Sequence, residues 1–130
     1  MKKDEMKEKV LEYIEQNDHV SYAELEWLFE QNDYDYKGNL DALSERCEHV
    51  VFWTGWKKEA YDMLGELISE GKAHRKPTPL FTYLIDGKTL LLPQVKRNTQ
   101  YKTDHWLPAV FCKGPERQQV QFPNLMSMLL

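Results

Sequence analysis

Histidine and cysteine are the residues of this chain best suited to metal binding or acid–base chemistry, and it has four of the first and two of the second. Cys47 and Cys112 lie far apart, and neither has the second nearby cysteine that the usual zinc motifs require. No two histidines have the i, i+4 spacing that places two ligands on one helix face. His49 follows Glu48 directly, yet adjacent side chains usually point apart. We therefore expect two free thiols, with no metal ion and no cofactor.

Sequence signatures of catalysis are absent as well. A phosphate-binding loop needs glycines at fixed spacing before a helix, because the backbone must approach the phosphate closely. The six glycines make no such pattern, and the nucleophile motif G-x-S-x-G does not occur. We therefore expect a protein that binds, and not an enzyme.

Charge is divided unevenly along this chain, whose net charge is −4. Residues 1–48 carry six basic and fourteen acidic side chains, whereas residues 71–117 carry nine basic and three acidic ones. The split predicts an acidic face and a basic face. Because cations bind nucleic acid through its phosphates, the basic part is the candidate site for DNA of either strandedness. The predicted contacts are Lys57, Lys58, Lys72, Arg75, Lys76, Lys88, Lys96, Arg97 and Lys102.

Residues 22–36 argue against DNA binding, because their five carboxylates and no cation would repel a phosphate backbone. The alternative function is a protein-interaction module, in which the acidic face, with Tyr34 and Tyr36 exposed, meets a basic surface. An apolar tail is its second candidate contact, to a partner or to a second copy in a homodimer. The predicted partner-binding residues are Leu125, Met126, Met128, Leu129 and Leu130. Whether this tail instead packs on the domain's own core stays open.

Hydrophobic periodicity predicts the elements that position these residues. The predicted helices span residues 4–16, 22–31, 40–48 and 56–70, and the second begins with the capping box Ser21-x-x-Glu24. Short strands are predicted at residues 19–20, 50–53 and 106–112. The clearest strand signal is a hairpin of residues 80–85 and 88–92 around Asp86-Gly87, a pair typical of type I′ turns. We expect Trp53 and Trp106 in the core and Trp27 partly exposed, while Trp56 is left open.

This order of elements predicts an α+β fold, namely a winged-helix-like domain in which helices are followed by a β-hairpin wing. Two alignments are open: the third helix is either residues 40–48 or residues 56–70. The second is slightly favoured, because the hairpin then follows the third helix directly, where a wing belongs. The domain spans residues 1–112, and residues 113–130 form a C-terminal tail with room for a short apolar helix.

Three runs of the sequence resemble small, mostly uncharacterised proteins encoded by phages and pathogenicity islands of Gram-positive bacteria. They are VVFWTGW at residues 50–56, YLIDGKTLLLP at residues 83–93 and HWLP at residues 105–108. The resemblance implies a cytoplasmic accessory or regulatory protein of a mobile genetic element, and it assigns no functional residue. No apolar run reaches the roughly 18–20 residues of a membrane span, and the charged N-terminal stretch lacks the apolar region of a secretory signal. We therefore expect a cytoplasmic protein without a membrane partner.

Overall fold

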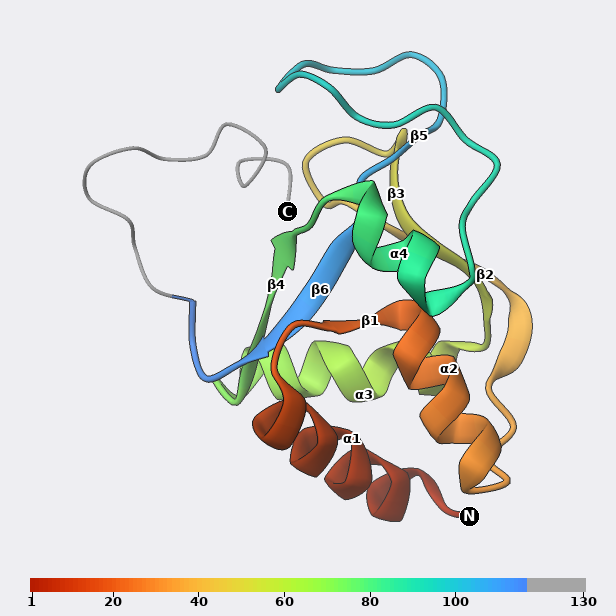
Figure 1. The fold of residues 1–130 in the computed structure, drawn as a ribbon, viewed down its shortest axis with the longest axis vertical. Helices are drawn as coiled ribbons and strands as arrows, with labels where there is room; N and C mark the ends of the chain where they lie inside the picture. Colours follow the sequence, from red (N-terminus) through yellow and green to blue (C-terminus); the bar gives the residue numbers. More distant parts are fainter. Residues whose placement is uncertain (117–130) are drawn as a thin grey trace.

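The computed structural model describes residues 1–116, which form a mixed α+β fold of four helices and two small sheets (Figure 1). The helices are α1 (Lys3–Asn17), α2 (Tyr22–Gln31), α3 (Lys58–Ser69) and α4 (Leu80–Asp86). The strands are β1 (Val20–Ser21), β2 (Lys37–Leu43), β3 (Val50–Trp56), β4 (Ala73–Pro77), β5 (His105–Trp106) and β6 (Ala109–Lys113). None of the helices in this part of the chain is long and apolar enough to cross a membrane.

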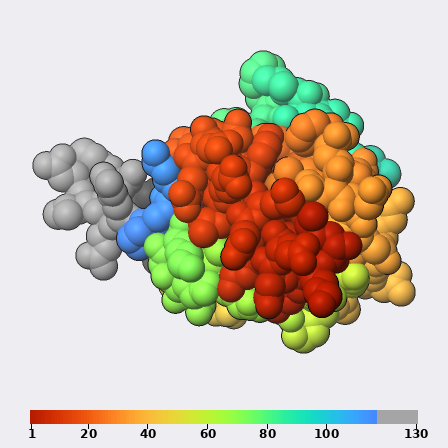
Figure 2. Space-filling view, turned by 90° about the horizontal axis from the view of Figure 1, so that it is seen from below, coloured from red at the N-terminus to blue at the C-terminus, as the bar shows by residue number. Residues whose placement is uncertain are grey.

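The first sheet joins the two ends of the described chain. Its strand order is β1-β6-β4, and both pairings are antiparallel. Phe111 in the central strand pairs with Val20 on one side and with Arg75 on the other. Helices α1 and α3 contact each other and this sheet, and in Figure 2 α1 lies across the surface between α2 and α3.

The second sheet has the strand order β2-β3-β5. Strands β2 and β3 are consecutive and antiparallel, and they lie between α2 and α3 in the sequence, whereas β5 joins β3 in parallel. Gly38 in β2 lies so close to β3 that a Cβ there would approach the backbone of Lys57 to 2.6 Å. Only glycine fits this approach.

The core is dominated by aromatic side chains from several elements. Trp53 and Trp106 are buried as predicted, and Trp56, left open by the sequence, is buried too. Tyr22 stacks on Trp53, with ring centroids 5.9 Å apart, and contacts Trp56 edge-on. Trp27 is 53% exposed, which confirms the predicted partial exposure.

Several local signals between residues 4 and 70 are confirmed. Met6, Val10 and Ile14 form the buried stripe of α1. At the start of α2, Ser21 Oγ accepts a hydrogen bond from the Glu24 N–H at 3.0 Å, and the Glu24 carboxylate accepts one from the Ser21 N–H. The predicted helix of residues 56–70 and the strand of residues 50–53 are present as α3 and β3.

The predicted hairpin of residues 80–92 is wrong. Residues 80–86 form α4, and no strand follows in residues 88–92. Gly87, with φ 82°, ends the helix in the left-handed conformation, so the Asp-Gly pair marks a helix C-terminus and not a hairpin turn. The β propensity of residues 80–85 is overridden by tertiary packing, since Tyr83 inserts into the aromatic core.

Two predictions about residues 33–48 are also wrong. The helix of residues 40–48 is absent, because residues 37–43 pair with β3 as strand β2 and leave Leu40 and Leu43 exposed. Tyr34 and Tyr36 are buried instead of exposed, and both rings pack against Phe29 of α2.

Candidate functional site

Two of the predicted nucleic-acid contacts serve the fold itself. The guanidinium of Arg75 lies over the ring of Phe52, 3.8 Å from its centroid, and donates to the Tyr22 hydroxyl at 3.2 Å. Lys88, predicted at a hairpin tip that does not exist, donates to the carboxylate of Glu26. Both cations therefore have partners within the chain.

The cations at the start of α3 also lie beside carboxylates. Lys58 forms an i, i+4 ion pair with Asp62. Lys57 lies over the Tyr34 ring, 5.0 Å from its centroid, with a Glu59 oxygen at 3.9 Å. The acidic partners reduce the positive potential that this end of α3 presents to a phosphate backbone.

The remaining predicted cations fall into two groups. Lys72 precedes β4 and Lys76 lies within it, whereas Lys96, Arg97 and Lys102 belong to the long segment between α4 and β5. That segment extends at the opposite end of the molecule from the start of β4 (Figure 1). The nine cations are therefore not brought together in one strip.

The loop cations, meaning Lys96, Arg97 and Lys102, are the group most open to a ligand. All three are exposed. The Tyr101 hydroxyl accepts from the backbone N–H of Lys96 at 2.9 Å and of Arg97 at 3.0 Å, so it holds this part of the segment together.

Two carboxylates of α2 accept hydrogen bonds from side chains of the same chain, and one of the two is buried. Glu26, only 8% exposed, accepts from the indole N–H of Trp53 at 2.7 Å and of Trp56 at 2.8 Å through one oxygen. Glu30 accepts from the Tyr36 hydroxyl at 2.7 Å. The acidic face predicted from the sequence is thus partly a set of interior acceptors.

Helix α4 presents apolar side chains to solvent. Phe81, Leu84 and Ile85 are 67%, 58% and 69% exposed. Their i, i+3, i+4 spacing places them on one side of the helix, and we call them the α4 ridge. The opposite side is fixed by Tyr83, whose hydroxyl donates to the Ala109 carbonyl at 2.7 Å and accepts from the Tyr22 N–H at 3.1 Å.

A shallow hollow of about 290 Å³ adjoins the end of α4. It is lined by Tyr13, Ala23, Glu24, Trp27 and Asp86. Burial, with a smaller contribution from nearby Asp86, raises the pKa of the Glu24 carboxyl. Burial and the hydrogen bond to Glu24 raise the pKa of Tyr13 to about 12. This hollow offers carboxylates and an exposed indole, which suit a cationic guest.

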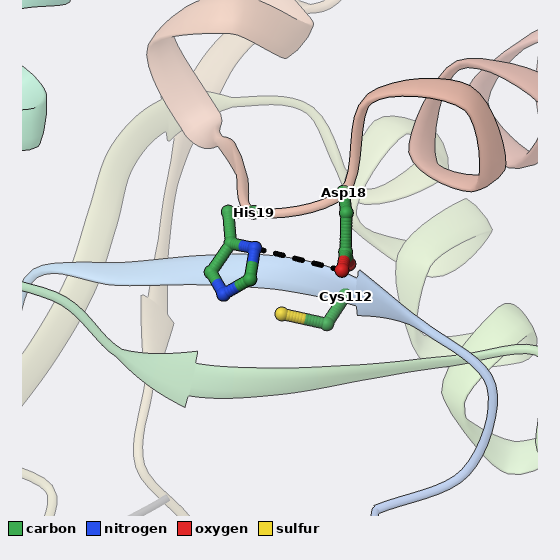
Figure 3. Close-up of side chains that lie close together, drawn as sticks. All are labelled: Asp18, His19 and Cys112. Carbon is green, nitrogen blue, oxygen red and sulfur yellow. Dashed lines mark ion pairs between the residues drawn. The ribbon is translucent and has the colours of Figure 1, made fainter.

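Asp18, His19 and Cys112 form a cluster of potential metal ligands (Figure 3). One potential ligand atom from each of the three residues lies within 4.8 Å of the other two. Among residues 1–116, no other three His, Cys, Asp or Glu side chains bring their ligand atoms this close together. Burial raises the pKa of the Cys112 thiol. Cys47 and Cys112 are both free thiols, as predicted.

Sequence reasoning missed the α4 ridge and this cluster for different reasons. Pro79 before the apolar run and Gly87 after it are helix-boundary signals that would have favoured α4. The cluster had no usable signal, since Cys112 lies in the last strand, far along the chain from Asp18 and His19. The predicted tail contacts Leu125, Met126, Met128, Leu129 and Leu130 lie outside the described residues.

Comparisons of the chain with protein-family models, with curated proteins and with solved structures found no match. The functional assignment therefore depends on the geometry of these surfaces alone.

Proposed function

We propose that this chain is a protein-binding module whose α4 ridge docks into an apolar groove of a partner protein. The observation that carries this proposal is the exposure of Phe81, Leu84 and Ile85 on a helix. The opposite side of that helix is fixed by the hydrogen bond from the Tyr83 hydroxyl to the Ala109 carbonyl. Fully burying an aliphatic or aromatic side chain of this size stabilises by roughly 1.5–3 kcal/mol. Apolar residues at i, i+3 and i+4 are the usual anchors of a helix that binds in a groove.

The rigidity of α4 favours binding at this ridge. Tyr83 packs against the rings of Trp53 and Trp106, with centroids 5.3 Å and 5.0 Å away. The Ser21 hydroxyl donates a hydrogen bond to the Asp86 carboxylate at 2.6 Å and fixes the C-terminal end of α4. A preorganised ridge loses little conformational entropy on binding.

The hollow beside α4 defines the chemistry of the partner. Asp86 ends α4 and also lines the hollow, next to Glu24 and the exposed indole of Trp27. The volume of the hollow, about 290 Å³, is at the lower limit for small-molecule sites and suits a single side chain. We therefore propose a partner that presents an apolar groove with a lysine or arginine at its rim.

We also propose that the domain is a winged-helix variant, with α3 as the third helix. The element order α1, β1, α2, α3, β4, β6 supports it, as does the antiparallel strand order β1-β6-β4. In this alignment β2 and β3 are an insertion before the third helix, and residues 78–108 stand where a simple hairpin wing would be. The resemblance to phage and pathogenicity-island proteins favours a host or phage protein as the partner.

Nucleic-acid binding by an accessory protein of a mobile element remains the second candidate. The loop cations Lys96, Arg97 and Lys102 favour it, because they are exposed within one short stretch and none of them is in an ion pair among residues 1–116. Three phosphate contacts would give only weak binding with a shallow dependence on salt. The α4 ridge has no role in this alternative.

The test compares three full-length chains: the natural one, Phe81→Ser/Ile85→Ser, and the control Leu40→Ser/Leu43→Ser. The control removes two apolar side chains of β2 that are also exposed. Each chain is screened against a displayed library of small folded domains whose surface grooves are randomised, and the Kd of each selected domain is measured. We expect domains whose grooves combine apolar residues with lysine or arginine, and their binding should be weakened about tenfold or more by the ridge substitutions and unchanged in the control.

Three other outcomes would overturn this assignment. Binding of the selected domains that survives the ridge substitutions would move the site away from α4. Concentration-dependent dimers in light scattering, lost in the ridge variant, would assign the ridge to a second copy. Salt-dependent binding of random DNA in fluorescence anisotropy, lost in Lys96→Ala/Arg97→Ala/Lys102→Ala and kept in the ridge variant, would favour the nucleic-acid function.

A further inference from the structure

The connection between α1 and β1 brings three different ligand atoms to one place (Figure 3). Asp18 and His19 form this connection, and Cys112 lies in β6, the strand that pairs with β1. The carboxylate of Asp18, the imidazole of His19 and the thiol of Cys112 lie within 4.8 Å of one another. This cluster is separate from the α4 ridge and plays no part in the proposed docking.

An unusual backbone makes the cluster possible. Asp18 and His19 both have φ 50°, a region that residues other than glycine rarely adopt and that costs about 1–3 kcal/mol each. In an extended chain, neighbouring side chains point to opposite faces. The positive-φ backbone at these two residues instead brings both adjacent side chains near the same sulfur atom.

The Asp18 carboxylate is held by hydrogen bonds from the cluster itself and from β6. Its Oδ1 accepts from the backbone N–H of Lys113 at 3.1 Å, and the Asp18 N–H donates to the Ile14 carbonyl at 2.8 Å. Oδ2 faces His19 Nδ1 at 3.5 Å. The His19 side chain is 58% exposed, so its imidazole is accessible to an ion from solvent.

We propose that Asp18, His19 and Cys112 bind one divalent transition-metal ion, with Zn²⁺ the best match and water in a fourth position. Thiolate, imidazole and carboxylate are the three protein ligands of zinc. Sulfur selects zinc over magnesium or calcium, which take oxygen ligands. Bond lengths of about 2.0–2.3 Å place tetrahedral ligand atoms roughly 3.5 Å apart, a spacing that His19 Nδ1 and Asp18 Oδ2 already have at 3.5 Å.

Binding replaces the S–H bond of Cys112 with a sulfur–metal bond and releases the proton to solvent, with no change in oxidation state. The ion would tie the α1–β1 connection to β6. Because it binds the folded chain and not the unfolded one, the melting temperature should rise with metal concentration.

A matched control is present in the same chain. His49 Nδ1 lies 2.9 Å from Asp104 Oδ1, with Glu48 3.7 Å from its other nitrogen, yet no sulfur completes that group. Cys47 is a second buried free thiol, outside the cluster. Substitutions at His49 and Cys47 therefore change the same residue types without touching the proposed site.

The experiment titrates the metal-stripped full-length chain with Co²⁺, followed by absorption, and with Zn²⁺, followed by calorimetry. We expect one ion per chain, a thiolate-to-cobalt charge-transfer band and the visible bands of tetrahedral cobalt. Cys112→Ser should abolish the charge-transfer band. His19→Gln and Asp18→Asn should weaken Zn²⁺ binding about tenfold or more, whereas Cys47→Ser and His49→Gln should leave both readouts unchanged.

Several results would overturn the proposal. These are the absence of a thiolate band in the natural chain, its persistence in Cys112→Ser, or its loss in Cys47→Ser. If Cys112→Ser does not fold, His19→Gln decides, because its exposed side chain contributes little to stability. Undiminished Zn²⁺ affinity in that variant would show that the trio is only a hydrogen-bonded group.

Discussion

Helices α2 and α4 contact each other, but they bury and expose opposite kinds of side chain. In α2 a charged residue faces inward: Glu26 is 8% exposed and accepts from two buried indoles. In α4 the apolar residues face outward, with Phe81, Leu84 and Ile85 all more than half exposed. One charged side chain is thus buried in α2, while three apolar ones are left exposed on α4.

The contrast separates side chains that the fold needs from those that it does not use. A buried carboxylate is tolerated only where donors satisfy its oxygens, so Glu26 and its indole partners are a structural unit. Exposed apolar side chains contribute little to the stability of the free chain. Their presence on a fixed helix is the observation from which the docking of α4 is proposed. Four predictions, ordered from the largest expected effect to the smallest, test this division.

Glu26→Ala should be the most destabilising change. It leaves the indole N–H groups of Trp53 and Trp56 without an acceptor in the core and also removes the partner of Lys88. At about 1–3 kcal/mol for each unsatisfied group, we expect a loss of about 3–5 kcal/mol in the free energy of unfolding. Urea denaturation followed by tryptophan fluorescence measures it.

Glu26→Gln is the matched control for this substitution. Its amide oxygen still accepts from both indoles, so the expected loss is smaller, about 1–2 kcal/mol. Equal losses in the two variants would mean that the negative charge of Glu26, and not its hydrogen bonds to the indoles, stabilises the core.

Tyr83→Phe should have the next largest effect. The ring is kept, but the Ala109 carbonyl and the Tyr22 N–H both lose a buried partner. We expect a loss of about 2 kcal/mol in urea unfolding and faster hydrogen exchange of the Tyr22 amide. An unchanged amide exchange rate would contradict the anchoring of α4 through this hydroxyl.

Alkaline pH should weaken the fold through Tyr13, by less than the two core substitutions. Burial, together with the hydrogen bond to Glu24, raises the pKa of Tyr13 from 10.0 to about 12. The neutral hydroxyl is thus favoured in the folded state, and its contribution is complete below pH 10 and lost as the pH rises through 12. Urea midpoints measured across this range should fall less steeply in Tyr13→Phe, and equally steep curves would argue against this role.

Phe81→Ser/Ile85→Ser should change the stability least, by about 0.5 kcal/mol or less. Both side chains are more than two-thirds exposed in the folded chain, so little burial is lost. Thermal and urea unfolding of this variant should match those of the natural chain. A loss of several kcal/mol would break the comparison, because it would mean that the ridge is covered by another part of the same chain.

Prediction from the sequence succeeded where the signal is local. The capping box at Ser21, the apolar stripe of α1 and the run of residues 50–53 depend on near neighbours, and all three are confirmed. It failed for the predicted helix of residues 40–48 and the predicted hairpin of residues 80–92, where strand and helix propensities are close and packing against β3 or the aromatic core decides.

The candidate sites divide in the same way. The sequence identified Arg75 and Lys88 as cations, but their partners Phe52 and Glu26 come from other elements. It likewise identified Cys112 as a free thiol, but not its neighbours Asp18 and His19. Pairings between distant segments leave no periodic pattern, so a single sequence does not reveal them.

By itself, the sequence determined the mixed α+β composition, the amphipathic helices α1 and α3 and the division of charge, because these follow from residue type and spacing. Only the tertiary structure decided which charges face inward, which apolar side chains remain outside and which three ligand atoms meet at the α1–β1 connection. The physical reason is that burial and contact depend on what the rest of the chain brings to each residue. Local propensities of about 1 kcal/mol yield to the several kcal/mol of a packed core.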